Sequence, residues 1–136
     1  MTPPWLIPVA FAPLCYYHWL QVPSENSALL NIGLFIAGFA HWSFLEYVLH
    51  RFVFHAEDHD YFIKNRYFYV FHFLIHGIHH AFPNDHYRIV FPPILGYQVW
   101  YYILQCIYRK FLPPWIFYMF AIGVVQGYVA YDSIHY

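Results

Sequence analysis

Histidine side chains gather in one stretch near the middle of the chain. His76, His79 and His80 lie within HGIHHAFPNDHYRIVFPP at positions i, i+3 and i+4. Residues three and four apart share one face of a helix, so this spacing predicts a helix that presents several imidazoles to one metal centre. Imidazole binds zinc, copper, iron and nickel alike, so the cluster by itself indicates a metal site without selecting the metal.

Two further fragments carry histidines that are candidate ligands. EYVLHRFVFH contains His50 and His55, and DSIHY contains His135. His50 and His55 are five residues apart, which is off a single α-helical face, so we expect them to straddle a helix end and to approach a metal from different angles. Structural zinc sites usually include cysteine, and neither cysteine lies near a cluster. The number of imidazoles exceeds what one tetrahedral ion needs, which favours two ions, or one ion with further histidines around its ligands.

The composition places these clusters beside a membrane. Of the 136 residues, 61% are hydrophobic and only 10% are charged, against about 25% charged in a typical soluble domain. A soluble domain of this size could not bury so much apolar surface, whereas a bilayer can solvate it. The formal net charge of -1 gives no electrostatic footprint for nucleic acid, so we expect no nucleic-acid partner.

Four apolar stretches are candidate membrane helices. They run from about Trp5 to Leu20, from the candidate N-cap Ser27 to His50, from Arg88 to Arg109 and from Pro114 to about Tyr131. Backbone polar groups in lipid must be satisfied within the segment, and these lengths suit helices. We therefore expect an all-α, multi-pass integral membrane protein with about four transmembrane helices and a histidine-rich cap on one face. Residues 1–136 are interpreted as one domain.

The order of the stretches predicts that the histidine clusters meet. Two stretches separate His80 from His135, and an even number of crossings returns the chain to the same side of the membrane. The histidine side also carries four of the six Lys and Arg residues, which favours the cytoplasmic face because cytoplasmic loops are enriched in basic residues.

Polar neighbours of these histidines are candidates for orienting them. A metal-bound imidazole usually donates its other ring N–H to a carboxylate or carbonyl group. The candidates are Glu46 beside His50, His72 beside His76 and Asp132 beside His135. Asp85 and Arg88 follow the central cluster, and we expect them to pair across the turn; the alternative is that Arg88 binds a lipid carboxylate or phosphate.

At these fragments the chain resembles the membrane fatty acid 2-hydroxylases, within the fatty acid hydroxylase and sterol desaturase superfamily. EYVLHRFVFH, HGIHHAFPNDHYRIVFPP and GYVAYDSIHY look like the successive motifs of that family. The resemblance implies a helical protein of the endoplasmic reticulum membrane with a di-metal centre on its cytosolic face, functionally two iron ions, with zinc an alternative in purified protein. By motif, the implied ligands are His50, His55, His76, His79, His80 and His135.

The resemblance also implies an oxidoreductase of lipid metabolism. Such enzymes insert oxygen at C2 of a fatty acyl chain, in a fatty acid or a ceramide, with dioxygen and electrons from a cytochrome b-type donor. In the family the motif that begins at His135 continues to more histidines, so we expect the chain as written to be weak or inactive. The alternative is a non-catalytic subunit that assembles with other subunits of a larger membrane complex, for example a respiratory complex of the mitochondrial inner membrane.

Overall fold

Every element of the described part of the chain is a helix. The computed structural model describes residues 3, 5–56, 65–82 and 92–135, apart from the side chains of Ile75, His79 and His135. The elements are α1 (Leu6–Trp19), α2 (Ala28–Leu49), η1 (His50–Phe54), α3 (Arg66–His72), η3 (Phe73–Gly77), α4 (Ile78–Ala81), α6 (Pro93–Val99), η4 (Trp100–Leu104), α7 (Gln105–Phe111) and α8 (Pro114–His135). The three η elements are single π-helical turns, in which the N–H group bonds the carbonyl five residues earlier. No strand occurs in these residues, so the all-α prediction is confirmed.

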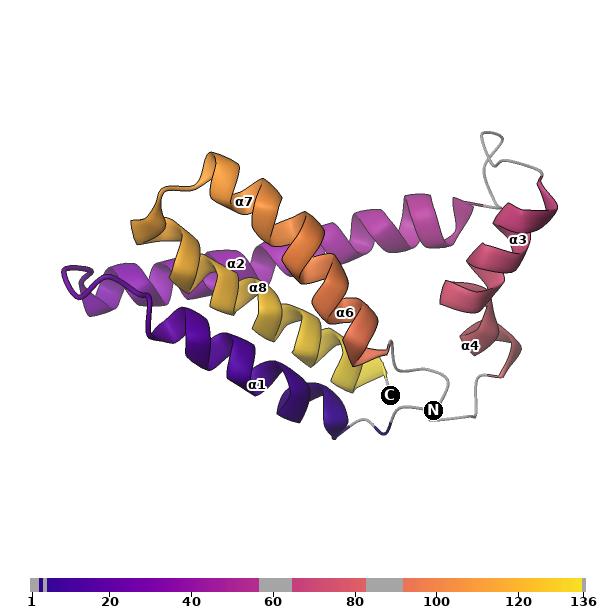
Figure 1. Cartoon of the computed structure of the whole chain (residues 1–136), viewed down its shortest axis with the longest axis horizontal. Coiled ribbons are helices and arrows are strands. Elements are labelled where there is room, and N and C mark those ends of the chain that lie inside the picture. Colours follow the sequence, from indigo (N-terminus) through magenta and orange to yellow (C-terminus); the bar gives the residue numbers. More distant parts are fainter. Residues whose placement is uncertain (1–2, 4, 57–64, 83–91, 136) are drawn as a thin grey trace.

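Helix α8 lies at the centre of the fold. It packs along α2 on one side and against α1 on the other, while the rod formed by α6, η4 and α7 crosses over it (Figure 1). The buried core joins α1, η4 and α8 and consists of Ile7, Phe11, Leu14, Trp100, Phe117, Ala121, Val124, Val125 and Val129. α3, η3 and α4 follow one another without a break and form one helical segment, the α3–α4 segment, which stands apart beyond the C-terminal end of α2 (Figure 1).

Glycines bring α2 and α8 unusually close together. A Cβ atom built on Gly38 would lie 2.1 Å from the carbonyl oxygen of Phe120, and one built on Gly123 would lie 2.2 Å from that of Phe35. No side chain fits at either position unless the helices move apart. Small residues at such contacts are typical of helix packing in membranes, where close backbone approach replaces the hydrophobic effect.

The contact between α2 and α8 continues towards the C-terminal ends of both helices. A Cβ atom on Gly127 would lie 2.7 Å from Cβ of Trp42, and the Trp42 and Tyr128 rings meet edge to face with centroids 5.3 Å apart. The two helices are therefore parallel, and both point to the end of the molecule where the α3–α4 segment lies (Figure 1).

The opposite end is fixed by polar contacts around the turn before α2. The Ser27 hydroxyl accepts a hydrogen bond from the Leu30 N–H group at 3.2 Å, which confirms the predicted N-cap. Asn26 donates from Nδ2 to the carbonyl oxygen of Trp115 at 2.8 Å. The turn thereby connects the start of α2 to the first turn of α8.

Two helices are long and apolar enough to cross a membrane, judged by length and composition. They are α2 continued through η1, residues Ala28–Phe54, and α8, residues Pro114–Ile134. Only 6% of the apolar window of α2 is buried, as expected for a helix that faces lipid. Helix α1 has 14 residues, which span only about 21 Å. All four apolar stretches contain helix as predicted, while the number of four membrane crossings stays a prediction.

Candidate metal centre

A π-helical turn aligns the first two histidines. His55 donates its backbone N–H to the carbonyl oxygen of His50 at 3.0 Å, and this bond closes η1. The i→i+5 bond adds a residue to the turn, so side chains five apart meet as side chains four apart do in an α-helix. The Nε2 atoms of His50 and His55 consequently lie 3.1 Å apart. His55 does follow a helix end as expected, but the π-turn that brings the rings together was not predicted.

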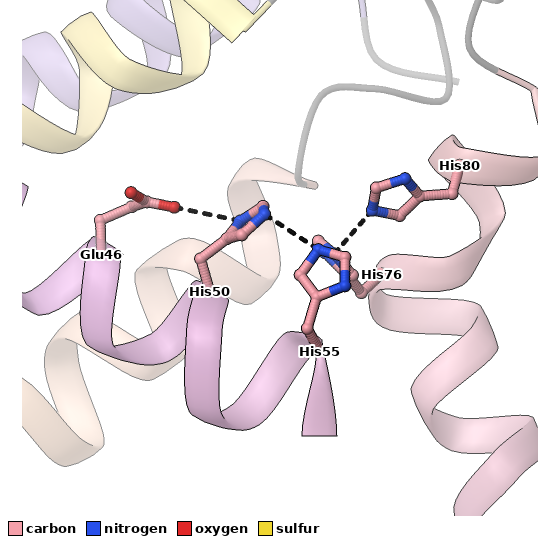
Figure 2. A network of polar contacts seen from close by, with 5 residues as sticks. All are labelled: Glu46, His50, His55, His76 and His80. Atoms are coloured by element: carbon pink, nitrogen blue, oxygen red, sulfur yellow. Dashed lines mark hydrogen bonds and ion pairs between the residues drawn. The ribbon is translucent and has the colours of Figure 1, made fainter. Parts of the chain in front are cut away.

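The α3–α4 segment supplies the other half of the cluster. His76 lies in η3 and His80 in α4, one turn apart, and their Nε2 atoms are 3.0 Å from each other. His76 is buried and His80 is exposed. The Nε2 atom of His76 also lies 3.4 Å from that of His55, so the two segments meet through their imidazoles (Figure 2).

The spacing of these nitrogens fits the ligand shell of a metal ion. With metal–nitrogen bonds of about 2.1 Å, neighbouring ligand nitrogens lie about 3.0 Å apart at octahedral angles and about 3.4 Å apart at tetrahedral angles. The three Nε2 separations in the cluster run from 3.0 to 3.4 Å. Ligand atoms of His50, His55 and His76 all lie within 4.8 Å of one another. The described histidines therefore suit a divalent transition metal.

Glu46 lies where it can orient His50. Its Oε1 atom is 3.3 Å from Nδ1 of His50 (Figure 2), and the Glu46 side chain is only 16% exposed. A carboxylate at Nδ1 favours the tautomer that carries its proton there, and this tautomer leaves the Nε2 lone pair available to a metal. The arrangement is the one that the one-turn spacing of the two residues predicts.

His72 connects α3 to η1, the two segments that carry the clustered histidines, through a contact with the backbone. Its buried ring donates from Nε2 to the carbonyl oxygen of Phe54 at the end of η1. The ring centroids of His72 and His76 lie 6.2 Å apart. With its Nε2–H bound to the backbone, His72 holds α3 against η1; its expected role in orienting a ligand stays a prediction.

Phe54 is a part of the site that sequence reasoning missed. Its ring stacks on the imidazole of His76 with centroids 4.9 Å apart and an interplanar angle of 17°. The stacking restricts the rotation of the His76 ring and covers one of its faces. The signal in the sequence was an aromatic residue directly before His55. Because 26% of the chain is aromatic, Phe54 did not stand out from the other aromatic residues.

The remaining predicted site residues are only partly described. His79 lies in α4 and His135 is the last residue of α8, and the side chains of both lie outside the described part. Asp132 is buried in α8, one turn before that helix ends beside the α3–α4 end of the bundle (Figure 1). Asp85 and Arg88 fall in residues 83–91, which lie outside the described residues.

Known proteins resemble this chain over nearly its whole length, although no family model matches the sequence. The ceramide very long chain fatty acid hydroxylase SCS7 of Saccharomyces cerevisiae is 35% identical over 97% of the chain. The fatty acid 2-hydroxylase of Mus musculus is 39% identical over 93%, and the dihydroceramide fatty acyl 2-hydroxylase FAH1 of Arabidopsis thaliana is 37% identical over 97%. The chain is a homologue of the fatty acid 2-hydroxylases.

The likeness to these hydroxylases extends to the fold. The solved structure of full-length Scs7p, in which only the hydroxylase domain is visible, superimposes with a TM-score of 0.87 at 35% identity, covering 98% of this chain and 50% of that one. The chain spans about a third of the yeast and mouse fatty acid 2-hydroxylase homologues and about half of the plant one: 34%, 32% and 54% of their lengths. The predicted relationship to this family is confirmed.

Proposed function

We propose that this chain forms the histidine-ligated metal centre of a membrane fatty acyl 2-hydroxylase. The observation that carries the proposal is the meeting of four imidazole Nε2 atoms at ligand spacing in a homologue of these enzymes. Two come from η1 and the residue that follows it, and two from the α3–α4 segment. The net reaction replaces one C–H bond at C2 of the acyl chain with C–OH. It consumes dioxygen, two electrons and two protons, and releases water.

The protein's part in this chemistry is to hold and orient the metal. The proposed ligands are His50, His55, His76, His79, His80 and His135, and Glu46, His72 and Asp132 are proposed to orient them. Iron, proposed as two ions, would supply the redox chemistry that activates dioxygen. Zinc has the same preference for imidazole and is expected to occupy the site in some purified samples.

The apolar surface supports a multi-pass membrane protein. By the resemblance to the fatty acid 2-hydroxylases, we propose that the centre lies at the cytosolic face of the endoplasmic reticulum. Exposed apolar residues cover α2, and a bilayer that solvates them would also deliver a fatty acid or ceramide. We propose four membrane-embedded helices in one domain and a cytochrome b-type protein as electron donor. Arg88 is proposed to pair with Asp85 or to bind a lipid head group.

Metal content tests the proposed centre. The full chain is purified in detergent from cells grown with iron, and its iron and zinc are counted by elemental analysis. We expect bound metal in the wild type and little in His50→Ala and His76→Ala. His41→Gln is the matched control, because His41 contacts Tyr108 and lies outside the cluster. Equal metal in all four proteins would contradict the proposed ligands.

Isotope labelling tests the reaction. Membranes that contain the chain are supplied with a reductase system, ceramide and 18O-labelled dioxygen, and the acyl products are analysed by mass spectrometry. We expect a low yield of product from the chain as written, with one 18O atom at C2, and none from His76→Ala. Tightly bound iron without any labelled product would argue against catalysis by this chain and favour a structural subunit.

A further inference from the structure

Two adjacent basic residues end the rod formed by α6, η4 and α7. Arg109 and Lys110 lie in the last turn of α7, and both side chains are exposed. Figure 1 shows that this end of the rod lies near the start of α8, at the end of the molecule opposite to the α3–α4 segment. Neither residue forms an ion pair with a carboxylate of the described residues, and Glu25, in the turn before α2, pairs with neither. The two positive charges therefore have no countercharge within the described part of the chain.

The Arg109 guanidinium is held in place by residues at the start of α8. Its Nη2 atom donates to the Tyr118 hydroxyl at 3.4 Å, and its Cζ atom lies 5.2 Å from the centroid of the Phe117 ring and 5.8 Å from that of the Tyr118 ring. Because a guanidinium has five N–H groups, this one hydrogen bond leaves donors for a further acceptor. A cation that already packs on aromatic rings also loses less side-chain freedom when it binds an anion.

Exposed aromatic residues indicate which surface this end of the molecule meets. Trp19 ends α1, Phe111 ends α7 and Trp115 lies in the first turn of α8, and all three are exposed. Asn26, before the start of α2, donates to the Trp115 carbonyl at the same end. Tryptophan is enriched at the boundary between membrane and water, where the lipid head groups lie. The anion that this surface meets in a membrane is therefore the phosphate of a phospholipid.

We propose that Arg109 and Lys110 form a binding site for the phosphate of an anionic membrane phospholipid. The planar guanidinium of Arg109 binds two phosphate oxygens, and the ammonium of Lys110 adds a second charge. Two cations without a countercharge favour a head group with a net negative charge over phosphatidylcholine, whose choline cancels the charge of its phosphate. Basic residues also stabilise the last turn of a helix through its dipole, but that role does not require the contacts of Arg109 with Tyr118 and Phe117.

Lipid affinity tests the site directly. The full chain in detergent is titrated with phosphatidic acid, and bound lipid is counted by native mass spectrometry. We expect affinity to fall about tenfold in Arg109→Gln, which loses a charge and the planar fork, and about fivefold in Lys110→Gln, which loses one charge. Arg66→Gln is the matched control, because it removes an exposed positive charge from the first turn of α3 at the other end of the molecule; we expect wild-type affinity.

Further variants separate a shaped site from general attraction by charge. Arg109→Lys keeps the charge but loses the fork, and Tyr118→Phe removes the hydroxyl that holds Arg109; we expect losses of about threefold in each. Losses in Arg66→Gln equal to those in Arg109→Gln would overturn the proposal, as would wild-type affinity in Lys110→Gln. If Arg109→Gln does not fold, Lys110→Gln still provides the test, because its side chain is exposed.

Two additional measurements identify the ligand and separate this site from the metal centre. Inorganic phosphate at millimolar concentration should not displace phosphatidic acid; displacement would refute a lipid ligand and indicate a soluble anion. Cobalt(II) is a suitable probe of the metal centre, because its absorption spectrum reports its coordination and its affinity can be titrated on the full chain. We expect wild-type cobalt affinity in Arg109→Gln. A chain that binds phosphatidic acid as described but binds no cobalt would refute the proposed function and leave the lipid site supported.

Discussion

The carbonyl oxygen of His50 accepts a hydrogen bond from the backbone N–H of His55 at 3.0 Å, and the same turn holds their Nε2 atoms 3.1 Å apart. The backbone bond and the imidazole contact depend on one five-residue spacing. π-Helical turns occur often at functional sites, where they adjust the direction of a side chain. In this chain the π-turn brings together two histidines that an α-helix would hold on different faces. The Nε2 atoms of His50 and His55 are therefore adjacent.

Insertion of one alanine between Phe52 and Val53 tests this spacing. His55 would then be six residues from His50, which neither an α-turn nor a π-turn brings onto one face. We expect cobalt affinity to fall by about a hundredfold or more, because a ligand is lost from the shell. The control is an alanine inserted between Ser24 and Glu25, in the turn at the opposite end, which should leave affinity unchanged. Equal binding by both insertion variants would show that the π-turn is not needed.

Burial predicts that the two described histidines of the α3–α4 segment contribute unequally to metal affinity. His76 is buried and contacts both His55 and His80, whereas His80 is exposed. Water can replace an exposed ligand more easily than a buried one. In cobalt titrations we expect His76→Ala to lose about a hundredfold in affinity and His80→Ala about tenfold. The reverse order would contradict the arrangement of the cluster around His76.

The hydrogen bond from His72 to Phe54 should matter for geometry more than for coordination. His72→Ala removes the contact that holds α3 against η1. We expect roughly a tenfold loss of cobalt affinity, with the coordination spectrum of the remaining complex unchanged. A changed spectrum in His72→Ala would instead identify His72 as a ligand.

Glycine substitutions test the packing that positions α2 against α8. Gly38→Ala places a Cβ atom 2.1 Å from the Phe120 carbonyl oxygen, so the helices must separate. We expect a loss of about 1–3 kcal/mol in the free energy of unfolding in detergent. Gly33 is the matched control on the same helix, because a Cβ atom there meets nothing within 4 Å. Gly33→Ala should be neutral or stabilising by up to about 1 kcal/mol, since alanine favours helix. Similar losses in both variants would argue against a special contact at Gly38.

The parts of this structure that depend on local spacing were predictable from the sequence. Ser27 is an N-cap because its hydroxyl reaches the N–H group three residues on. His76 and His80 meet because they are one turn apart. The apolar stretches become helices for the same local reason, since their length and composition favour helix wherever the backbone must satisfy its own hydrogen bonds.

The unpredicted parts depend on contacts between segments or on a change of helix type. A hydrophobic pattern does not reveal whether five residues form a π-turn, so the alignment of His50 with His55 was missed. The pattern also does not reveal which helix a glycine faces, and the pairing of Gly38 with Phe120 was therefore not foreseen.

The position of α8 in the chain sets the order in which the packing of α2 is completed during synthesis. The four clustered histidines all precede α8, so the ribosome makes them before α8 is available to pack along α2. Until α8 docks at Gly38, α2 lacks the close contact that fixes its position. Docking of α8 would then be the step that sets α2, and with it Glu46 and the start of η1, in place.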